Sequence, residues 1–265
     1  PQGTRDRTSD ANWRKPLAWN RKAKAEGRRY RVFCASLADV FEDRPELAPW
    51  RADLLQMIIE TPHLDWLLLT KRPENVNRMV EQATGFSDSE MWFHAARNIW
   101  IGTSVENQVT ADERIPHLLR IPARVRFLSM EPLLGPVDIV RGGHLWARGI
   151  LSEMYEPPIQ WVIVGGESGQ HARPMHPDWA RFVRNQCEGL GIAFHFKQWG
   201  EWLPDSQVTD DQRPALYSPS SESIGGIGEY KKRLVSVGGG EGCWKVGKHA
   251  AGRLLDGREW NESPQ

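Results

Sequence analysis

The chain has 265 residues, of which 40% are hydrophobic and 13 are tryptophan, enough apolar material for the core of one large domain. Its 34 Lys and Arg residues balance its 34 Asp and Glu residues, which excludes a strong overall charge that would attract nucleic acid or lipid. No apolar run is long enough to span a bilayer and no N-terminal signal is evident, so we predict a cytoplasmic protein with no membrane partner.

Six short segments rich in β-branched and aromatic residues are predicted strands, and they recur at intervals of roughly thirty residues. They cover 31–35, 66–69, 99–102, 125–128, 161–164 and 193–196. Helical patterns separate several of them, at 50–60, 74–82, 111–119 and 177–190. This alternation predicts right-handed βαβ units and a parallel sheet.

Polar residues follow almost every predicted strand. They are Ser36 and Asp39; Thr70, Lys71 and Arg72; Ser104, Glu106 and Asn107; Ser129 and Glu131; Gly165, Gly166 and Glu167; Lys197 and Gln198. An open sheet concentrates its ligand site at one switch point, whereas a barrel draws on all its strand ends. We therefore predict an α/β fold, a partial (β/α) barrel of the TIM-barrel type that spans residues 1–265 as one domain, with these residues as its cofactor-binding rim.

Three stretches stand outside the strand and helix pattern. Residues 135–160 are long for a connection between a strand and a helix, and they predict an insertion or lid. Residues 203–243 are rich in proline and glycine and predict a mobile loop, and 244–262 predict a segment that docks back on the domain. The chain opens on Pro1 in a polar stretch, from which we expect a barrel truncated at its N-terminus.

The motif Gly165-Gly166-Glu167 directly follows a buried segment. Paired glycines let a backbone approach a ligand closely, and the carboxylate beyond them can hold a hydroxyl or amino group. The alternative is a tight turn in which the glycines serve backbone geometry alone. We favour the ligand interpretation because similar polar ends surround this one.

Charged residues at the other strand ends allow two interpretations. Lys71 and Arg72 can grip a carboxylate or phosphate, or can pair with Glu106 or Glu131. The two glutamates can act as an acid–base pair, although neutralisation by Lys71, Arg72 and Lys197 is the interpretation we favour. No residue is assigned a catalytic role.

Basic residues interleaved with tryptophans gather near both ends of the chain. They are Arg14, Lys15, Arg21, Lys22, Lys24, Arg28, Arg29 and Arg31 beside Trp13 and Trp19, and Lys231, Lys232, Arg233, Lys245 and Lys248 beside Trp244. Such a pattern binds single-stranded nucleic acid by charge attraction and stacking. A solvated surface is the alternative, and we favour it.

An ordered set of motifs covers nearly the whole chain, at 8–13, 32–41, 69–73, 102–108, 131–137, 165–169, 172–177 and 196–202. Together they resemble an uncharacterised phage and bacterial family with a three-cysteine motif, a domain of unknown function that is similar to radical S-adenosylmethionine (SAM) barrels. The resemblance implies a SAM cofactor and a [4Fe–4S] cluster. It places Gly165, Gly166 and Glu167 near the adenosine or methionine part of SAM, and Lys71, Ser104, Glu106 and Ser129 near its polar groups.

In that family the cluster cysteines lie in a loop just upstream of the segment that begins near Thr8. The cysteines of this chain, Cys34, Cys187 and Cys243, are far apart and odd in number, which favours reduced thiols over disulfides. Cys34 lies in a strand motif, so no metal ligand is assigned to any residue here.

Three functions remain open. The first is the barrel of a radical-SAM-like iron–sulfur enzyme of phage origin; the sequence does not identify its substrate, for which a nucleic acid or nucleotide is a candidate. The second is a non-catalytic barrel that binds a nucleotide, a nucleic acid, or a phage or host protein. The third, hydrolysis by Glu106 and Glu131, requires both carboxylates to face one pocket.

Overall fold

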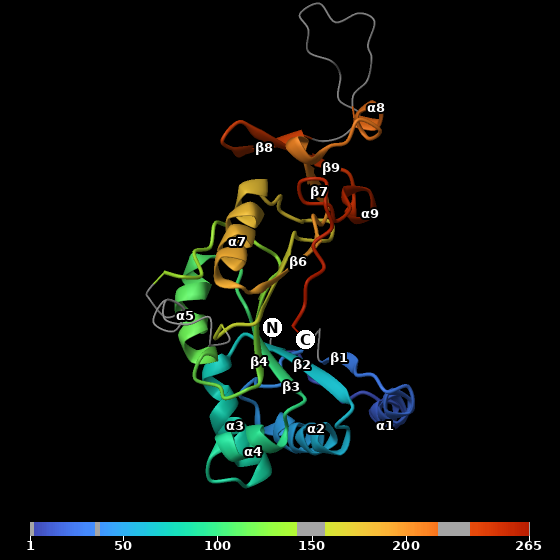
Figure 1. Ribbon diagram of the computed structural model, residues 1–265, viewed down its shortest axis with the longest axis vertical. Helices are drawn as coiled ribbons and strands as arrows, with labels where there is room; N and C mark the ends of the chain where they lie inside the picture. Colours follow the sequence, from blue (N-terminus) through green and yellow to red (C-terminus); the bar gives the residue numbers. More distant parts are fainter. Residues whose placement is uncertain (1–2, 35–37, 142–156, 217–233, 265) are drawn as a thin grey trace, which may run out of the picture. The chain divides into compact units, whose positions relative to one another are not determined.

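The computed structural model describes residues 3–34, 38–141, 157–216 and 234–264. Its larger sheet follows chain order, β1-β2-β3-β4-β5-β6 (Figure 1). The strands are β1 (Tyr30–Cys34), β2 (Leu64–Thr70), β3 (Ile99–Ser104), β4 (Val125–Met130), β5 (Trp161–Gly165) and β6 (Ala193–Gln198). β1 pairs with β2, β2 with β3 and β5 with β6, each in parallel. The predicted α/β fold is confirmed, and it is consistent with a partial (β/α) barrel.

The chain also contains helices, and several of them lie between strands of the larger sheet, as predicted. They are α1 (Asp10–Ala25), α2 (Ala48–Glu60), α3 (Val76–Thr84), α4 (Ser89–Ala95), α5 (Gln108–Leu118), α7 (Pro177–Leu190), α8 (Arg213–Leu216) and α9 (Lys248–Ala251), with 3-10 turns η1 (Pro45–Leu47), η2 (Pro73–Asn75) and η3 (Asp205–Gln207). The helices expected at 50–60, 74–82, 111–119 and 177–190 correspond to α2, η2 with α3, α5 and α7. None of the helices in the described ranges is both long and apolar enough to cross a bilayer.

The chain divides into two compact units. Unit 1 comprises residues 1–104 and 113–128, and unit 2 comprises residues 105–112 and 129–265. Each unit has its own buried hydrophobic residues.

The core of unit 1 lies between the sheet and its helices. β2 is buried along almost its whole length, and α2 buries Leu54, Leu55 and Ile58. Gly102 of β3 lies against the ring of Phe127, and any side chain at this position would overlap that ring. The glycine therefore serves packing inside unit 1.

Helix α1 begins where the side chain of Ser9 accepts a hydrogen bond from the backbone N–H of Asn12. Asp10 lies in its first turn and Lys22 and Lys24 lie in its last, an arrangement that complements the helix dipole. Neither α1 nor α4 was predicted from hydrophobic periodicity, because α1 buries only Pro16 and Ala23 and shows little apolar pattern.

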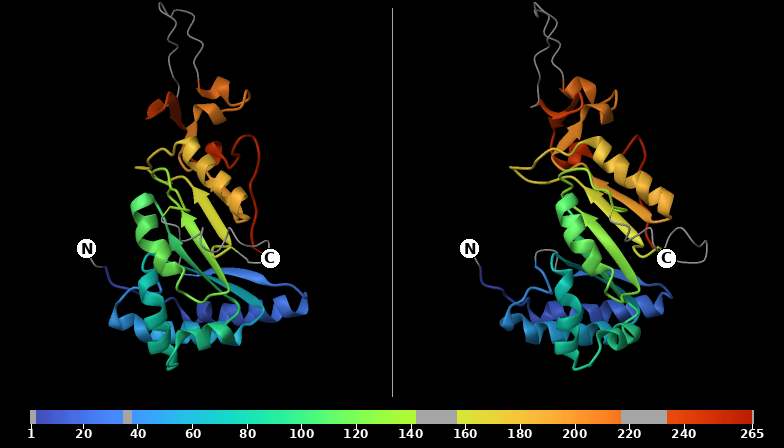
Figure 2. Two further views of the ribbon diagram at one scale, coloured as in Figure 1. Left: turned by 60° about the vertical axis from the view of Figure 1, so that its left-hand side comes forward. Right: turned by 90° about the vertical axis from the view of Figure 1, so that its left-hand side faces the viewer.

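Unit 2 contains a second, smaller sheet in the order β7-β9-β8, drawn in orange and red (Figure 2). Its strands are β7 (Trp202–Pro204), β8 (Leu234–Gly238) and β9 (Glu241–Lys245), and both pairings are antiparallel. These strands fall largely within 203–243, for which the sequence predicted a mobile loop, and residues 217–233 of that range lie outside the described residues. The side chains of Ala172, Trp202 and Cys243 pack together at this sheet.

The end of the chain lies against β5 and β6. The backbone N–H of Phe196 donates to the carbonyl of Trp260 at 3.0 Å, and the indole of Trp161 donates to the carbonyl of Glu262 at 2.8 Å. A carboxylate oxygen of Glu262 accepts from the backbone N–H of Phe194 at 2.9 Å. The predicted insertion at 135–160 falls largely outside the described residues.

Candidate functional site

In unit 1, the carboxylate of Asp39 joins the loop after β1 to the end of β2. Its Oδ1 accepts from the hydroxyl of Thr70 at 2.8 Å and from the backbone N–H of Phe41 at 3.0 Å. Its Oδ2 accepts from the guanidinium of Arg72 at 2.9 Å and from the backbone N–H of Lys71 at 3.0 Å. Four predicted rim residues therefore meet here, and Arg72 pairs with Asp39 instead of the glutamates weighed from the sequence. Ser36 lies outside the described residues.

A second carboxylate extends this network. Glu42 forms a bidentate pair with Arg5 at 2.9 and 3.1 Å and lies 3.8 Å from Arg72 and 3.7 Å from Arg44. The hydrogen bond from Arg5 and the surrounding positive charges hold the pKa of Glu42 below its ordinary value. Because Asp39 pairs with Arg72 and Glu42 pairs with Arg5, these two carboxylates hold their part of the loop after β1 in place.

In unit 2, Glu131 and Lys197 extend beyond the ends of β4 and β6. Lys197 Nζ lies 2.6 Å from Glu131 Oε2, and the Gln198 amide donates to Glu131 Oε1 at 3.0 Å and to the Ser168 hydroxyl at 3.2 Å. The Lys197 side chain is 49% exposed and that of Glu131 is 23% exposed. This is an ion pair that solvent, and therefore a solute, can reach.

The two glycines after β5 have different surroundings. A Cβ at Gly165 would lie 3.3 Å from the Glu131 side chain, so this glycine leaves space beside that carboxylate. A Cβ at Gly166 would overlap the carbonyl oxygen of Trp199, and one at Gly200 would overlap that of Glu167. Gly166 thus permits close backbone packing with 199–200, which is the geometric alternative considered for this motif.

Glu167 is held by Arg173. The guanidinium donates two hydrogen bonds to the carboxylate, both at 2.8 Å, and the backbone N–H of Arg173 adds a third at 2.7 Å. These contacts, led by the side-chain hydrogen bonds, keep the pKa of Glu167 below its ordinary value. The carboxylate therefore closes the turn after β5, and a ligand would have to compete with Arg173 for it.

Four more predicted rim residues, Ser104, Glu106, Asn107 and Ser129, make backbone hydrogen bonds. The carbonyl of Ser104 accepts from Arg114 at 2.8 Å, and the carbonyl of Ser129 accepts from the backbone N–H of Val105 at 2.9 Å. The backbone N–H groups of Glu106 and Asn107 donate to the Thr110 hydroxyl at 3.0 and 3.1 Å. Glu106 and Asn107 form the turn that begins α5, whereas Ser104 and Ser129 lie in β3 and β4.

The three cysteines are free thiols. Burial raises the pKa of Cys34 to about 11 and that of Cys187 and Cys243 to about 12. Among the residues that the structure describes, no three His, Cys, Asp or Glu side chains are grouped to hold a metal ion. The described residues thus do not fit an iron–sulfur cluster, and we derive no step through one.

The fold and its polar strand ends define an α/β protein of the partial (β/α) barrel class. Residues 2–264 match the model of a family described as "Protein of unknown function (DUF5131)", and the chain belongs to this family. No curated protein and no solved structure matches it. The predicted membership of an uncharacterised family is confirmed, and phage origin and a three-cysteine motif stay predictions.

Sequence reasoning missed several partners of the predicted residues. Arg5 and Glu42 lie outside every predicted strand end, and only their opposite charges could have linked them. Arg173 follows Glu167 by six positions across a glycine-containing turn, a spacing that permits such a pair without requiring it.

Proposed function

We propose that the strand ends of unit 2 bind a small zwitterionic molecule, for which SAM is the candidate that the resemblance to radical-SAM barrels implies. The observation that supports this is the accessible ion pair of Glu131 and Lys197, 2.6 Å apart. An α-amino acid head group carries the same two charges, an ammonium that matches Glu131 and a carboxylate that matches Lys197. The methionine part of SAM is such a head group.

Opening this ion pair costs little. A partly exposed pair contributes about 0–1 kcal/mol, because water solvates both partners when they separate. A bound head group would replace one ion pair by two and keep the Gln198 amide on Glu131. Gly165 leaves the space beside Glu131 free of a side chain.

Isothermal titration calorimetry with SAM, S-adenosylhomocysteine and methionine tests the proposal. Lys197→Met and Glu131→Gln should each weaken binding by roughly tenfold or more, the usual effect of losing a charge-assisted hydrogen bond. Lys248→Met, which removes an exposed cation of the same unit, is the matched control. Equal affinity in all variants, or no saturable binding of any of the three, would rule the site out.

Radical-SAM activity is a further step of this proposal. The resemblance implies cluster cysteines upstream of Thr8, and the described residues supply none. Iron content and visible absorbance after anaerobic reconstitution test it: about four irons per chain are expected when the genomic sequence upstream is included and none for residues 1–265 alone. The absence of iron from both forms would contradict radical-SAM activity, but it would not contradict the binding of a zwitterionic ligand by unit 2.

A second candidate function, nucleic-acid binding, is supported by the exposed face of α1. Helical geometry places Arg14, Arg21, Lys15 and Lys22 on one side of the helix, opposite the buried Pro16. The four cations are exposed and surround three exposed alanines at 11, 18 and 25. Such short side chains would let a phosphate chain approach the helix between the cations.

Fluorescence anisotropy with a labelled single-stranded oligonucleotide, measured across a salt series, tests this candidate. Arg21→Gln should reduce the salt slope by about 0.7, since each neutralised phosphate of a single strand contributes that amount. Lys24→Gln removes a charge from another side of the same helix and should have less effect. Binding that does not depend on salt, or identical slopes for both variants, would contradict it.

A further inference from the structure

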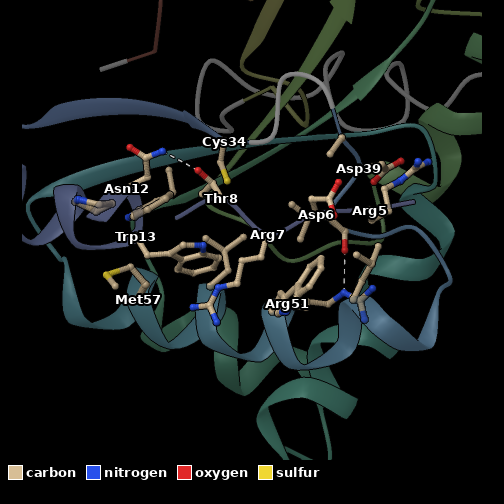
Figure 3. Close-up of a pocket in the computed structure, with 17 residues that line it drawn as sticks. Arg5, Asp6, Arg7, Thr8, Asn12, Trp13, Cys34, Asp39, Arg51 and Met57 are labelled. Atoms are coloured by element: carbon tan, nitrogen blue, oxygen red, sulfur yellow. Dashed lines mark hydrogen bonds between the residues drawn. The ribbon is translucent and has the colours of Figure 1, made fainter. Parts of the chain in front are cut away.

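Unit 1 contains a cavity of about 380 Å³ that the strand-end sites do not use (Figure 3). It is lined by the segment before α1, by α1 and α2, and by residues of β1, β2 and the loop after β1. Its volume lies within the range of small-molecule sites, about 300–1,000 Å³. We propose that this cavity binds an amino-substituted heteroaromatic molecule of the purine or pyrimidine class.

The walls of the cavity favour a flat aromatic ligand. Trp13, Trp50 and Trp66 contribute indole rings, and Met57 adds a polarizable thioether. The ring of Trp13 lies between Met57 and Arg7 in Figure 3, and the guanidinium of Arg7 lies 4.2 Å from its centroid. Planar heteroaromatic rings stack on such surfaces.

One hydrogen-bond donor in this lining has no partner. The Nε1 of Trp13 is buried and makes no hydrogen bond within the described part of the chain. By contrast, the indole nitrogen of Trp66 donates to the Thr61 hydroxyl at 2.9 Å. Nε1 has almost no accessible surface in this structure, so an acceptor on a ligand would reach it only if the Trp13 ring turned as the ligand stacked on it. Since a buried N–H is costly to leave unmatched, such a turn would be favoured by a ligand that carries an acceptor, such as a ring nitrogen or an exocyclic carbonyl.

A carboxylate in the same lining supplies a hydrogen-bond acceptor. Asp6 lines the same cavity and is exposed at its edge. Among the described residues no donor pairs with its oxygens, whereas Asp39, on the same lining, accepts hydrogen bonds from four donors. An exocyclic amino group on the ligand would satisfy Asp6, and a ring nitrogen would satisfy Trp13.

The arginines of the lining argue against a phosphate. Arg5 pairs with Glu42, Arg7 lies 3.1 Å from Asp53, and Arg51 donates to two backbone carbonyls at 2.8 and 2.9 Å. Each guanidinium is already engaged, so a phosphate would have to displace a partner. The cavity therefore fits a free base or nucleoside better than a nucleotide.

Calorimetric titration with adenine and cytosine tests the proposal. We expect saturable binding of at least one base, weaker binding of 6-methylpurine, which lacks the amino group, and no gain for adenosine monophosphate over adenosine. Failure of both bases to bind, or tighter binding of the monophosphate, would overturn the proposal.

Two variants locate the site. Trp13→Phe keeps an aromatic ring but removes the Nε1 donor, and it should weaken base binding by about tenfold. Trp19→Phe, an exposed position of the same helix, is the matched control. Lys197→Met should leave base binding unchanged, which separates this site from the strand ends of unit 2. Equal loss in Trp19→Phe, or loss in Lys197→Met alone, would contradict the assignment.

A measurement on the unaltered chain makes the test independent of variant folding. Cys34 lines the cavity, whereas Cys187 and Cys243 are buried elsewhere and lie outside its lining. A saturating concentration of the nucleobase that binds, adenine or cytosine, should slow the alkylation of Cys34 by N-ethylmaleimide. The alkylation rates of Cys187 and Cys243 should stay unchanged, and peptide mass spectrometry measures all three rates. An unchanged alkylation rate of Cys34 at a saturating nucleobase concentration would mean that the nucleobase binds outside this cavity, and it would contradict the proposal.

Discussion

Arg181 and Asp256 join helix α7 to the C-terminal segment by a bidentate contact. Nη2 of Arg181 lies 2.7 Å from Oδ1 of Asp256, and Nε lies 3.0 Å from Oδ1 and 3.3 Å from Oδ2. Arg184 donates to Oδ2 at 2.8 Å, and Gln207 donates to Oδ1 at 3.1 Å. Desolvation by itself would raise the pKa of Asp256, but these donors outweigh it and lower the pKa to about 2.

This carboxylate predicts acid sensitivity of unit 2. Because its pKa is lower in the folded state, Asp256 stabilises the fold above its unfolded pKa, and the contribution is lost as pH falls from about 4 towards 2. Asp256→Asn keeps the shape and tolerates the positive φ of 55° found here. We expect it to lower the free energy of unfolding at pH 7 by about 1–2 kcal/mol, with much of the Coulombic gain screened by solvent.

Urea unfolding at pH 7 and pH 3 measures this effect. The difference between the original chain and Asp256→Asn should shrink at pH 3, because this pH lies below the ordinary pKa near 4 but above the folded pKa of about 2, so folding must remove the proton that Asp256 binds in the unfolded chain. A constant difference at the two pH values would show that the charge of Asp256 does not contribute.

Gly166 provides a test of backbone packing. Alanine there would overlap the carbonyl oxygen of Trp199, and we expect a loss of more than about 2 kcal/mol of stability because backbone on both sides must shift. Gly189 lies inside α7, and no heavy atom outside the helix backbone lies within 4 Å of the position that a Cβ would take there. Gly189→Ala should therefore stabilise by about 0.5–1 kcal/mol, since alanine favours the helix. Thermal unfolding of the two alanine variants measures both stability changes. Equal changes would refute the argument that Gly166 is required for backbone packing against Trp199.

The sequence was sufficient for the larger sheet because its strands are short apolar runs whose spacing leaves space for helices between several of them. All six predicted segments overlap β1 to β6, with residue 35 of the first outside the described residues, and α7 has the predicted bounds. The helix ended where expected because Gly191 adopts a φ of 66°, which glycine allows at little cost.

The sequence was insufficient where partners are set by tertiary geometry. Helix α1 has a basic, alanine-rich exposed face, so its hydrophobic pattern was weak, and its capping residue Ser9 was the better signal. The pairing of Arg72 with Asp39 depends on the loop after β1 reaching the end of β2. The cavity around Trp13 depends on how α1 and α2 pack, which periodicity does not specify.

The three thiols should be nearly inert in the folded chain. With a pKa of about 11, Cys34 is expected to be about one part in a thousand thiolate at pH 8, and Cys187 and Cys243 less. Alkylation at pH 8 should therefore be at least about a hundredfold slower than in urea, where an ordinary pKa near 8.5 applies. Mass spectrometry of labelled peptides measures each rate, and a Cys34 that reacts at the denatured rate would contradict its burial.

Asp39 should be the most sensitive carboxylate of unit 1, because its two oxygens accept hydrogen bonds from both the loop after β1 and the end of β2. Asp39→Asn exchanges one acceptor oxygen for an amide that donates, and it leaves Arg72 without a charge partner at that position. We expect a loss of about 2–3 kcal/mol in unfolding free energy, since the side chain is largely buried. Asp43→Asn is the matched control: its carboxylate pairs with Arg78 at 2.9 Å but is 67% exposed, so its loss should be under about 1 kcal/mol. Urea unfolding at pH 7 measures both losses. Equal losses in the two variants would mean that Asp39 does not hold the end of β2 in place. Its contacts with Thr70 and Arg72 would then be no stronger than those of a surface pair.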